Sequence, residues 1–246
     1  MTDISRSTSR LRAIEIVILG TVLFVVTVGI VGRAVGSIFQ RQAGSSARAL
    51  VTVRLSGAML GELVFLILLV IYLRGQGRTL RELGLWKTSP ARGWILAGIF
   101  AGLYLWMTFA AVLRGHTALS EVSVFHIYNS LTAGIVAGFV EEIFFRGFVI
   151  SELEWARLGP VLQVIASGVL FGIAHSGWGL FSGHVNWPAL IGSVSATTIM
   201  GLAFAIAYLA SRRSLMPVIT GHLVMDCLIE PWLILTAMTG VMTHPH

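Results

Sequence analysis

The chain has 246 residues, of which 56% are hydrophobic and 11% charged, and its mean hydropathy is +0.86. Soluble domains carry roughly 25% charged residues, so this deficit and several long apolar runs predict an all-α, polytopic transmembrane helix bundle. A transmembrane β-barrel would instead have shorter segments of alternating hydrophobicity. The formal net charge of +6 comes mostly from arginines outside the apolar runs, which is typical of loops beside membrane spans and argues against a nucleic-acid partner.

Seven apolar segments are predicted to cross the bilayer as helices of about 20 residues. They are residues 13–32, 58–73, 94–113, 130–150, 161–181, 188–209 and 218–238. Basic residues gather in the connector 33–57 and in the loop 74–92, whose amphipathic stretch 79–86 is expected to lie along the membrane interface. No internal repeat or soluble domain is visible, so residues 1–246 are expected to form one integral-membrane domain.

The distribution of basic residues predicts a cytoplasmic N-terminus, because cytoplasmic loops carry an excess of Lys and Arg. In this orientation the N-terminal arginines and the five basic residues of 74–92 lie inside. The four arginines of 33–57 lie outside, against the rule, so that connector is expected to be interfacial, or the first segment not to span simply. The Gly-, Ala- and Arg-rich composition favours a prokaryotic cell (inner) membrane.

Ionisable side chains interrupt three of the predicted spans. In chain order they are Glu141, Glu142 and Arg146, then His175, then His222 and Asp226. A charge at membrane depth costs roughly 2.5–3.5 kcal/mol on insertion scales, so lipid-facing positions are unfavourable for such groups. We therefore expect the three spans to bring these side chains together inside the bundle.

The spacing of the acidic residues divides their roles. Glu142 and Arg146 are four residues apart with the glutamate first, which is the favourable order for an ion pair within one helix. Glu141 is rotated away from this pair, on the face that carries Gly134 and Gly138, where another helix could approach closely. The alternative that both glutamates form a buried ion-pair cluster fixing helix packing stays open.

The two histidine segments each have i,i+4 spacing. Phe171 precedes His175 by four residues and is expected to close one wall of a pocket, while His222 and Asp226 share a helix face. Alone, His175 would be typical of a packing group, and the His222–Asp226 pair of a structural contact or half of a metal site. Simple counting puts His175 nearer the opposite end of its span from Glu141, which a tilted or broken helix would reconcile.

Together, these groups form the set needed for amide hydrolysis without a covalent intermediate. A carboxylate and an imidazole that face one water molecule make a general base. A second imidazole nearby could donate a hydrogen bond to the developing oxyanion. Other ionisable residues receive minor roles: Glu62 is expected to pair with a connector arginine or lie near the headgroups, and His126 and His184 to be solvated in outer loops.

The pattern Glu141-Glu142-x-x-x-Arg146, Phe171-x-x-x-His175 and His222-x-x-x-Asp226, in this order on separate spans, resembles the CAAX-protease and bacteriocin-processing (CPBP/Abi) family of intramembrane glutamic endopeptidases. The resemblance covers about residues 130–230. It implies that Glu141 and His175 activate the water and that His222, with the residue at 226, forms the oxyanion hole. It also implies that Glu142 and Arg146 support Glu141.

Asp226 departs from the prenyl-protein endopeptidases of this family, which usually have Asn there. An ionised Asp226 would repel an oxyanion, a protonated one could donate to it, and a third role is to orient and charge His222 from behind, which we favour. The departure puts prenylated CAAX substrates in doubt. The expected substrate is a membrane-associated peptide or protein. Prenylated tails, signal peptides, pheromones and bacteriocin leaders stay open as substrates, and so does the oligomeric state.

Two other function classes compete with this hypothesis. A metal-dependent membrane protease would use the histidines and carboxylates as zinc ligands, but the sequence has no H-E-x-x-H helix and the water-activating pair needs no metal, so no cofactor is expected. A non-enzymatic transporter or immunity-type protein would use buried Glu, His and Asp as a proton relay. Against transport, the sequence shows no inverted repeat and no paired broken helices apart from Pro231.

Overall fold

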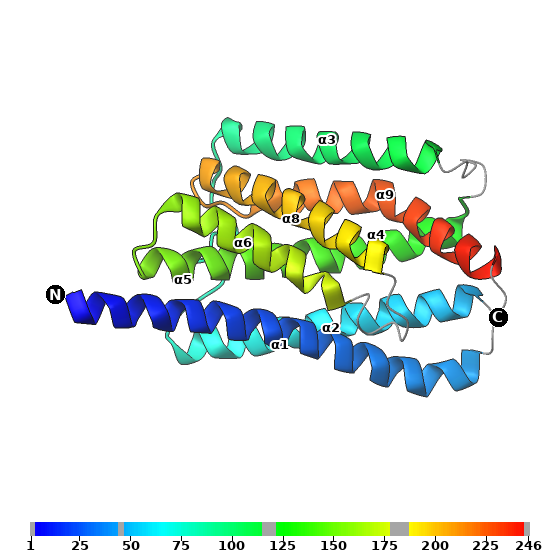
Figure 1. Ribbon diagram of the computed structural model, residues 1–246, viewed down its shortest axis with the longest axis horizontal. Helices are drawn as coiled ribbons and strands as arrows, with labels where there is room; N and C mark the ends of the chain where they lie inside the picture. The colour runs from blue at the N-terminus through cyan, green and yellow to red at the C-terminus, as the bar shows by residue number, and fades with distance from the viewer. Residues whose placement is uncertain (1–2, 44–46, 115–121, 178–186, 244–246) are drawn as a thin grey trace.

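The computed structural model describes residues 3–43, 47–114, 122–177 and 187–243, and these are helical apart from short turns (Figure 1). The helices are α1 (Asp3–Ala43), α2 (Ala47–Gly75), α3 (Ala91–Arg114), α4 (Val124–Glu142), the π-helix η2 (Ile143–Val149), α5 (Ile150–Trp155), α6 (Pro160–Ala174), α8 (Trp187–Ala210) and α9 (Met216–Thr243). The predicted fold class, a polytopic helical bundle, is confirmed. In the described part of the chain, five helices are long and apolar enough to cross a membrane; these lie within α1, α2, α3, α8 and α9.

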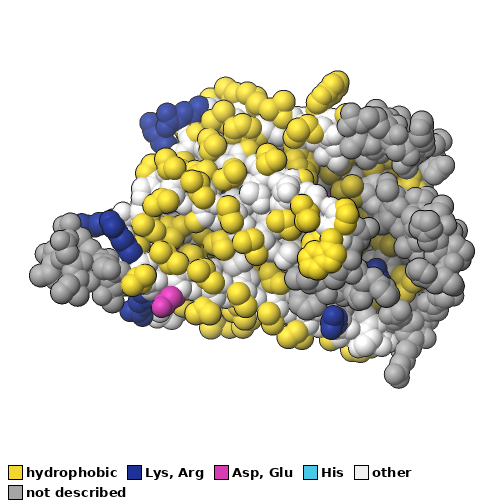
Figure 2. Space-filling model, in the orientation of Figure 1, with side chains coloured by type: hydrophobic (Ala, Val, Ile, Leu, Met, Phe, Trp, Pro, Cys, Tyr) yellow, Lys and Arg dark blue, Asp and Glu magenta, His cyan; other side chains and the backbone are white. Residues whose placement is uncertain are grey.

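The outer surface has the character of a lipid-facing one. Figure 2 shows hydrophobic side chains over most of the visible face, with lysines and arginines toward its edges. Large apolar residues such as Leu19, Ile67, Trp106 and Val161 are exposed on helices that form the periphery. Because the described outer faces of these helices are apolar, they are stable in a bilayer and not in water, so the chain is an integral membrane protein.

The first two helices are longer than the sequence predicted. α1 continues to Ala43 and α2 begins at Ala47, so the expected connector 33–57 is mostly helix. The arginines of this stretch indicated a connector between two spans. Because arginine is a good helix former, the helices continue through them. Glycines let the two helices touch: a Cβ added to Gly61 would lie 2.6 Å from the Val28 Cα, which no side chain tolerates.

Residues 79–86, expected as an amphipathic interfacial segment, form a series of turns. Gly84 has φ +100° and Trp86 φ 63°, both in the left-handed region, so a regular helix could not pass through this stretch. Leu83 and Leu85 are buried, and the Tyr208 hydroxyl donates a hydrogen bond of 2.9 Å to the Leu83 carbonyl. The apolar residues of this stretch therefore pack the loop against the ends of the helices instead of facing the membrane interface.

The helix that carries the paired glutamates begins earlier and changes its winding. α4 starts at Val124, so His126, expected in a solvated loop, is instead 3% exposed in the first turn, where its Nδ1 lies 3.0 Å from the Ser123 backbone nitrogen. Directly after Glu142 the chain forms the π-helix η2, all seven residues of which are buried. Ser167 of α6 donates a hydrogen bond of 2.9 Å to the Phe145 carbonyl in this π-helix.

α6 ends where the sequence predicted a continuing span. It has 15 residues, about 22 Å at 1.5 Å per residue, which is too short to cross a hydrocarbon core of about 30 Å. His175 therefore lies at its C-terminal end, inside the bundle, and the expected mismatch in depth between His175 and Glu141 disappears. The predicted end of this span at Phe181, and His184, lie outside the described residues.

Small residues bring α9 against α4, on the face of Gly134 and Gly138 where the sequence predicted a close helix, and they also bring α8 against α6. A Cβ added to Gly134 would lie 2.8 Å from the Asp226 Cβ, and one added to Gly138 would lie 3.2 Å from the Leu223 nitrogen. A Cβ on Gly201 of α8 would lie 2.9 Å from the Gly168 Cα of α6. Close approach of these backbones places the side chains of α9 beside the glutamates of α4.

Candidate active site

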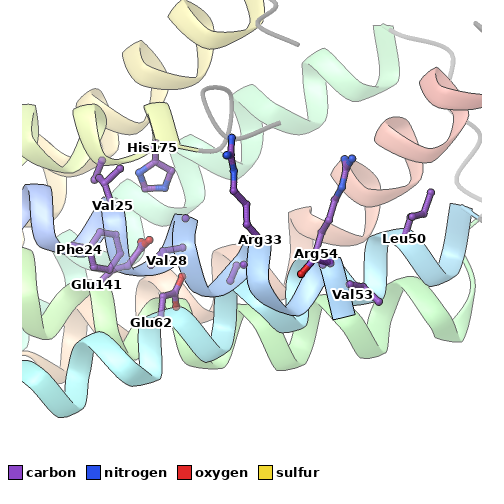
Figure 3. A pocket seen from close by; sticks show the side chains of 17 residues that line it. Phe24, Val25, Val28, Arg33, Leu50, Val53, Arg54, Glu62, Glu141 and His175 are labelled. Atoms are coloured by element: carbon purple, nitrogen blue, oxygen red, sulfur yellow. The ribbon is translucent and has the colours of Figure 1, made fainter. Parts of the chain in front are cut away.

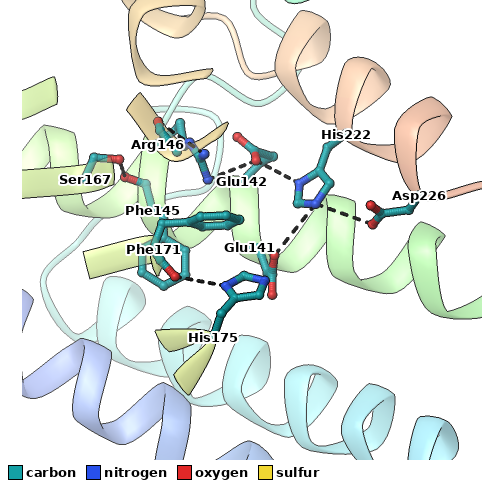
Figure 4. A network of polar contacts seen from close by, with 10 residues as sticks. Glu141, Glu142, Phe145, Arg146, Ser167, Phe171, His175, His222 and Asp226 are labelled. Atoms are coloured by element: carbon teal, nitrogen blue, oxygen red, sulfur yellow. Dashed lines mark hydrogen bonds and ion pairs between the residues drawn. The ribbon is translucent and has the colours of Figure 1, made fainter. Parts of the chain in front are cut away.

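The ionisable residues of the three interrupted segments converge in one network (Figure 4). Glu141 and Glu142 end α4, Arg146 lies in the π-helix, and His175 follows α6 directly. His222 and Asp226 lie in successive turns of α9. The structure therefore brings all of the predicted polar site residues to the centre of the bundle, with Phe171 packed among them.

Glu142 is the hub of the network. Its side chain and that of Arg146 are both 0% exposed, and Arg146 Nη1 lies 3.0 Å from Glu142 Oε1, as the i,i+4 spacing predicted. The same carboxylate oxygen lies 2.9 Å from His222 Nδ1. The Arg146 guanidinium also lies over the Phe171 ring, 4.3 Å from its centroid. Glu142 thus links its own helix to α9, a contact that the sequence did not indicate.

The contact with Glu142 defines the orientation of His222. A carboxylate paired with Arg146 can only accept, so His222 Nδ1 carries a proton and donates to it. The other ring nitrogen, Nε2, then faces Asp226 Oδ2 at 3.4 Å and Glu141 Oε2 at 3.8 Å. Either Nε2 or one of these carboxyl groups must carry a proton for the contacts to be favourable. Glu142 therefore orients the His222 ring through Nδ1, the role expected of Asp226. Asp226 instead lies near Nε2, the nitrogen that faces Glu141.

His175 is fixed by its own helix. Its Nδ1 lies 2.9 Å from the Phe171 carbonyl oxygen, and a carbonyl can only accept, so Nδ1 carries a proton. In the neutral ring the lone pair is therefore on Nε2. Figure 4 shows the His175 ring beside the Glu141 carboxyl group, and the Phe171 ring stacks at a tilt on it, with centroids 4.6 Å apart. This arrangement leaves Nε2 available to accept a proton or a hydrogen bond.

Glu141 and His175 line the same cavity, which has a volume of about 390 Å³ (Figure 3). The cavity lies between α1, α2 and the ends of α4 and α6, and its wall near the two residues is apolar, with Phe24, Val25 and Val28. His222 and Asp226 do not line it. Glu141 itself is only 5% exposed, so a molecule in the cavity would meet Glu141 and His175 first and His222 behind them.

Two arginines mark the other end of this cavity. Arg33 of α1 and Arg54 of α2 line it together with Leu50 and Val53. Arg54 precedes Glu62 by eight residues on α2, which corresponds to about 12 Å along the helix. The cavity therefore has an acidic end at the polar network, an apolar middle and a basic end.

Glu62 of α2 is a site residue that the sequence did not identify. It lines the same cavity as Glu141, is 5% exposed, and its Oε2 has no hydrogen-bond partner in the described residues. The expected pairing with a connector arginine is not seen at Oε2, and the expected place near the headgroups is wrong, because Glu62 lies 15 residues after the start of α2 at Ala47 and is buried at mid-helix. An isolated carboxyl in an apolar run was the available signal, since such groups are costly in a membrane.

Within the described residues, no three His, Cys, Asp or Glu side chains are grouped as a metal site. No curated protein and no solved structure matches the chain. A family model described as type II CAAX prenyl endopeptidase Rce1-like matches residues 122–228. This segment holds every residue of the network in Figure 4, and its limits lie close to the predicted 130–230. The resemblance predicted from the motifs is thereby confirmed: residues 122–228 are similar to the Rce1-like CAAX-type prenyl endopeptidases, a class of membrane endopeptidases.

Proposed function

We propose that the chain is a glutamic endopeptidase that cleaves a membrane-associated peptide or protein with a water molecule activated by Glu141 and His175. The observation that carries this proposal is the shared cavity: Glu141 and His175 both reach it, whereas Glu142 is held by Arg146 and His222. A carboxylate beside an imidazole whose Nε2 is available is a competent general base for water. The buried Glu142–Arg146 pair holds the end of α4 so that Glu141 keeps its direction.

The chemistry follows from these positions. Glu141, assisted by His175 Nε2, takes a proton from water as the water oxygen attacks the scissile carbonyl carbon. The carbonyl oxygen then carries negative charge and needs a donor. His222 is the proposed donor through Nε2, while its Nδ1 donates to Glu142. A ring that donates from both nitrogens is an imidazolium, and Asp226 at 3.4 Å from Nε2 favours that charged form. Asp226 thus charges His222 and is not itself the oxyanion donor.

The substrate is proposed to enter from the membrane. The walls of the cavity are apolar next to Glu141 and are formed mainly by helices long and apolar enough to cross a membrane. An extended peptide tail attached to a lipid or to a membrane helix fits such a site better than a soluble peptide does. The prenyl endopeptidase description of the matching family makes a prenylated tail the first candidate to test.

The test is cleavage by purified protein in lipid nanodiscs. Membrane-tethered peptides, with and without a farnesyl group, are incubated with wild type, Glu141→Gln and His175→Ala, with and without a chelator. The matched control is Glu82→Gln, which alters an exposed glutamate of the 79–86 turns. We expect chelator-resistant cleavage that falls at least about 10²-fold in the two site variants and is unchanged in the control.

Each other outcome identifies a different class. Cleavage that a chelator abolishes would indicate a metal-dependent protease. Normal cleavage by Glu141→Gln would exclude the proposed mechanism. If no peptide is cut by well-folded protein, proton flux into liposomes carrying wild type or Glu141→Gln would test the transporter alternative, because a relay through Glu141 requires its carboxyl group.

A further inference from the structure

Glu62 is a buried acid that the proposed mechanism does not use. It projects from α2 into the cavity, and Figure 3 shows its carboxyl group directed to the same space as that of Glu141. The two glutamates come from different helices, since Glu141 ends α4 and Glu62 lies in the middle of α2. A peptide lying in the cavity would therefore meet two carboxyl groups.

The surroundings of Glu62 favour a protonated side chain. Its Oε2 is buried and has no hydrogen-bond partner among the described residues. Another carboxyl group that lines the same cavity is that of Glu141. The arginines of the cavity lie at the far end, about 12 Å along α2 in the case of Arg54. A buried carboxyl group without a cation partner takes up a proton instead of staying ionised.

Amide hydrolysis needs such a group. An amine leaves a tetrahedral intermediate only after its nitrogen gains a proton, and a positioned carboxylic acid is one of the side chains that supply it. In the proposed function Glu141 and His175 activate the water molecule, and His222 Nδ1 donates to Glu142. Besides Glu141, Glu62 is the carboxyl group that lines the cavity in the described part of the chain, and it comes from a different helix.

We propose that Glu62 is the general acid that protonates the leaving nitrogen. The inference rests on the proposed function and deepens it. In the first step the water oxygen bonds to the carbonyl carbon and its proton goes to Glu141. In the second step the carbon–nitrogen bond breaks, and the nitrogen takes the proton of Glu62. After the products leave, the proton on Glu141 passes to Glu62 through water in the cavity, so one water molecule is consumed in each cycle.

Two substrates that differ only in the leaving group test this role. One is a farnesylated peptide with the normal scissile amide, and the other is the same peptide with a thioester at that bond. A thiol has a pKa of about 8.5, so a thiolate leaves without prior protonation, whereas an amine does not. Glu62→Gln is expected to slow amide hydrolysis by about 10²–10⁴-fold and to leave thioester hydrolysis close to the wild-type rate.

The controls separate this inference from the proposed function. Glu230→Gln changes another acid with a buried, unpartnered oxygen that lies outside the cavity, and it is expected to leave the amide-to-thioester ratio unchanged. Glu62→Asp keeps an acid and is expected to recover part of the amide activity. Glu141→Gln is expected to lose both substrates; if it cleaves both normally, the proposed function fails. An equal loss of both substrates in Glu62→Gln, or no loss, overturns the role of Glu62.

A second measurement needs no turnover. Infrared spectra of protein with isotope-labelled glutamate, recorded in nanodiscs at neutral pH, report the carbonyl stretch of protonated carboxyl groups. We expect a band in the wild type that disappears in Glu62→Gln and persists in Glu230→Gln, whatever band Glu230 itself contributes. If Glu62→Gln has the same carboxylic acid bands as the wild type, Glu62 is ionised and cannot be the proton donor.

Discussion

At the scale of single residues, the site is organised around a shortage of positive charge. Three buried or half-buried carboxyl groups, those of Glu141, Glu142 and Asp226, share one guanidinium and one imidazole. Arg146 is fully buried and lies next to Glu142 alone among them. Glu142 is thereby paired with Arg146 and accepts from His222 Nδ1, which leaves the other ring nitrogen of His222, Nε2, to serve the other two carboxyl groups.

Replacing Arg146 is therefore expected to reduce stability as well as activity. Arg146→Met leaves Glu142 buried without its guanidinium, and breaking a buried pair in this way costs about 3–5 kcal/mol. The double variant Glu142→Leu/Arg146→Met removes both charges and should recover much of that stability. It should stay inactive, because His222 Nδ1 then has no acceptor to orient it.

Thermal unfolding in detergent and peptide cleavage, measured on the two single variants and the double variant, check this expectation. A double variant whose loss of stability equals the sum of the single losses would show that the charges are not coupled. Recovered activity in the double variant would contradict the orienting role of Glu142.

The residues that the sequence identified share one property, and those it missed share another. The i,i+4 pairs were predictable because both partners lie on one helix, so the helix period alone relates Glu142 to Arg146 and His222 to Asp226. The Glu142–His222 contact spans 80 residues and depends on how α9 packs on α4, which no local pattern encodes. Glu62 was visible as an intramembrane acid, but its neighbours depend on the same packing.

At the scale of secondary structure elements, two departures from regular helix build the site. The π-helix η2 begins directly after Glu142 and contains Arg146. π-Helical segments are rare and frequently occur at functional sites, and sequence periodicity of 3.6 residues cannot reveal them. α6 ends at Ala174, which delivers His175 to the middle of the bundle. The residues after Ala174 are largely apolar and favoured a helix that continues to Phe181. The sequence thus predicted the helix but not the residue at which it ends.

The approach of α9 to α4 depends on glycine. Gly134→Ala adds a Cβ that would lie 2.8 Å from the Asp226 Cβ, and a backbone-proximal atom cannot move aside as the end of a long side chain can. The helices must separate, at a cost of about 1–3 kcal/mol, which is typical of overpacking. We expect lower thermal stability and a larger loss of cleavage, since His222 and Asp226 move with α9.

Gly98→Ala on α3 is the matched control, because nothing lies within 4 Å of its added Cβ. Alanine has the higher helix propensity, by about 1 kcal/mol, so this variant should be as stable as the wild type or slightly more stable. The two variants are compared by thermal unfolding and by cleavage of the same peptide. Equal behaviour of Gly134→Ala and Gly98→Ala would mean that close packing of α4 and α9 is not required.

At the scale of the whole molecule, orientation in the membrane decides from which side a substrate reaches the site. Loops 76–90 and 156–159, the 211–215 turn and the N-terminus lie at one end of the bundle, as Figure 1 shows. The arginine end of the cavity points to the other, because Arg33 follows Phe24 along α1 and Arg54 precedes Glu62 along α2. The basic residues of these loops predict that their end is cytoplasmic.

Single cysteines at the two ends test this orientation. In a Cys227→Ser background, Thr88→Cys labels the 76–90 loop and Val124→Cys labels the start of α4, where the native side chain is 81% exposed. In intact cells, a membrane-impermeant maleimide should react with Val124→Cys and spare Thr88→Cys until the membrane is permeabilised. The arginine end of the cavity then faces away from the cytoplasm and favours substrates that arrive on that side. The opposite labelling pattern would invert the orientation and turn that end of the cavity toward tails attached to the cytoplasmic face of the membrane.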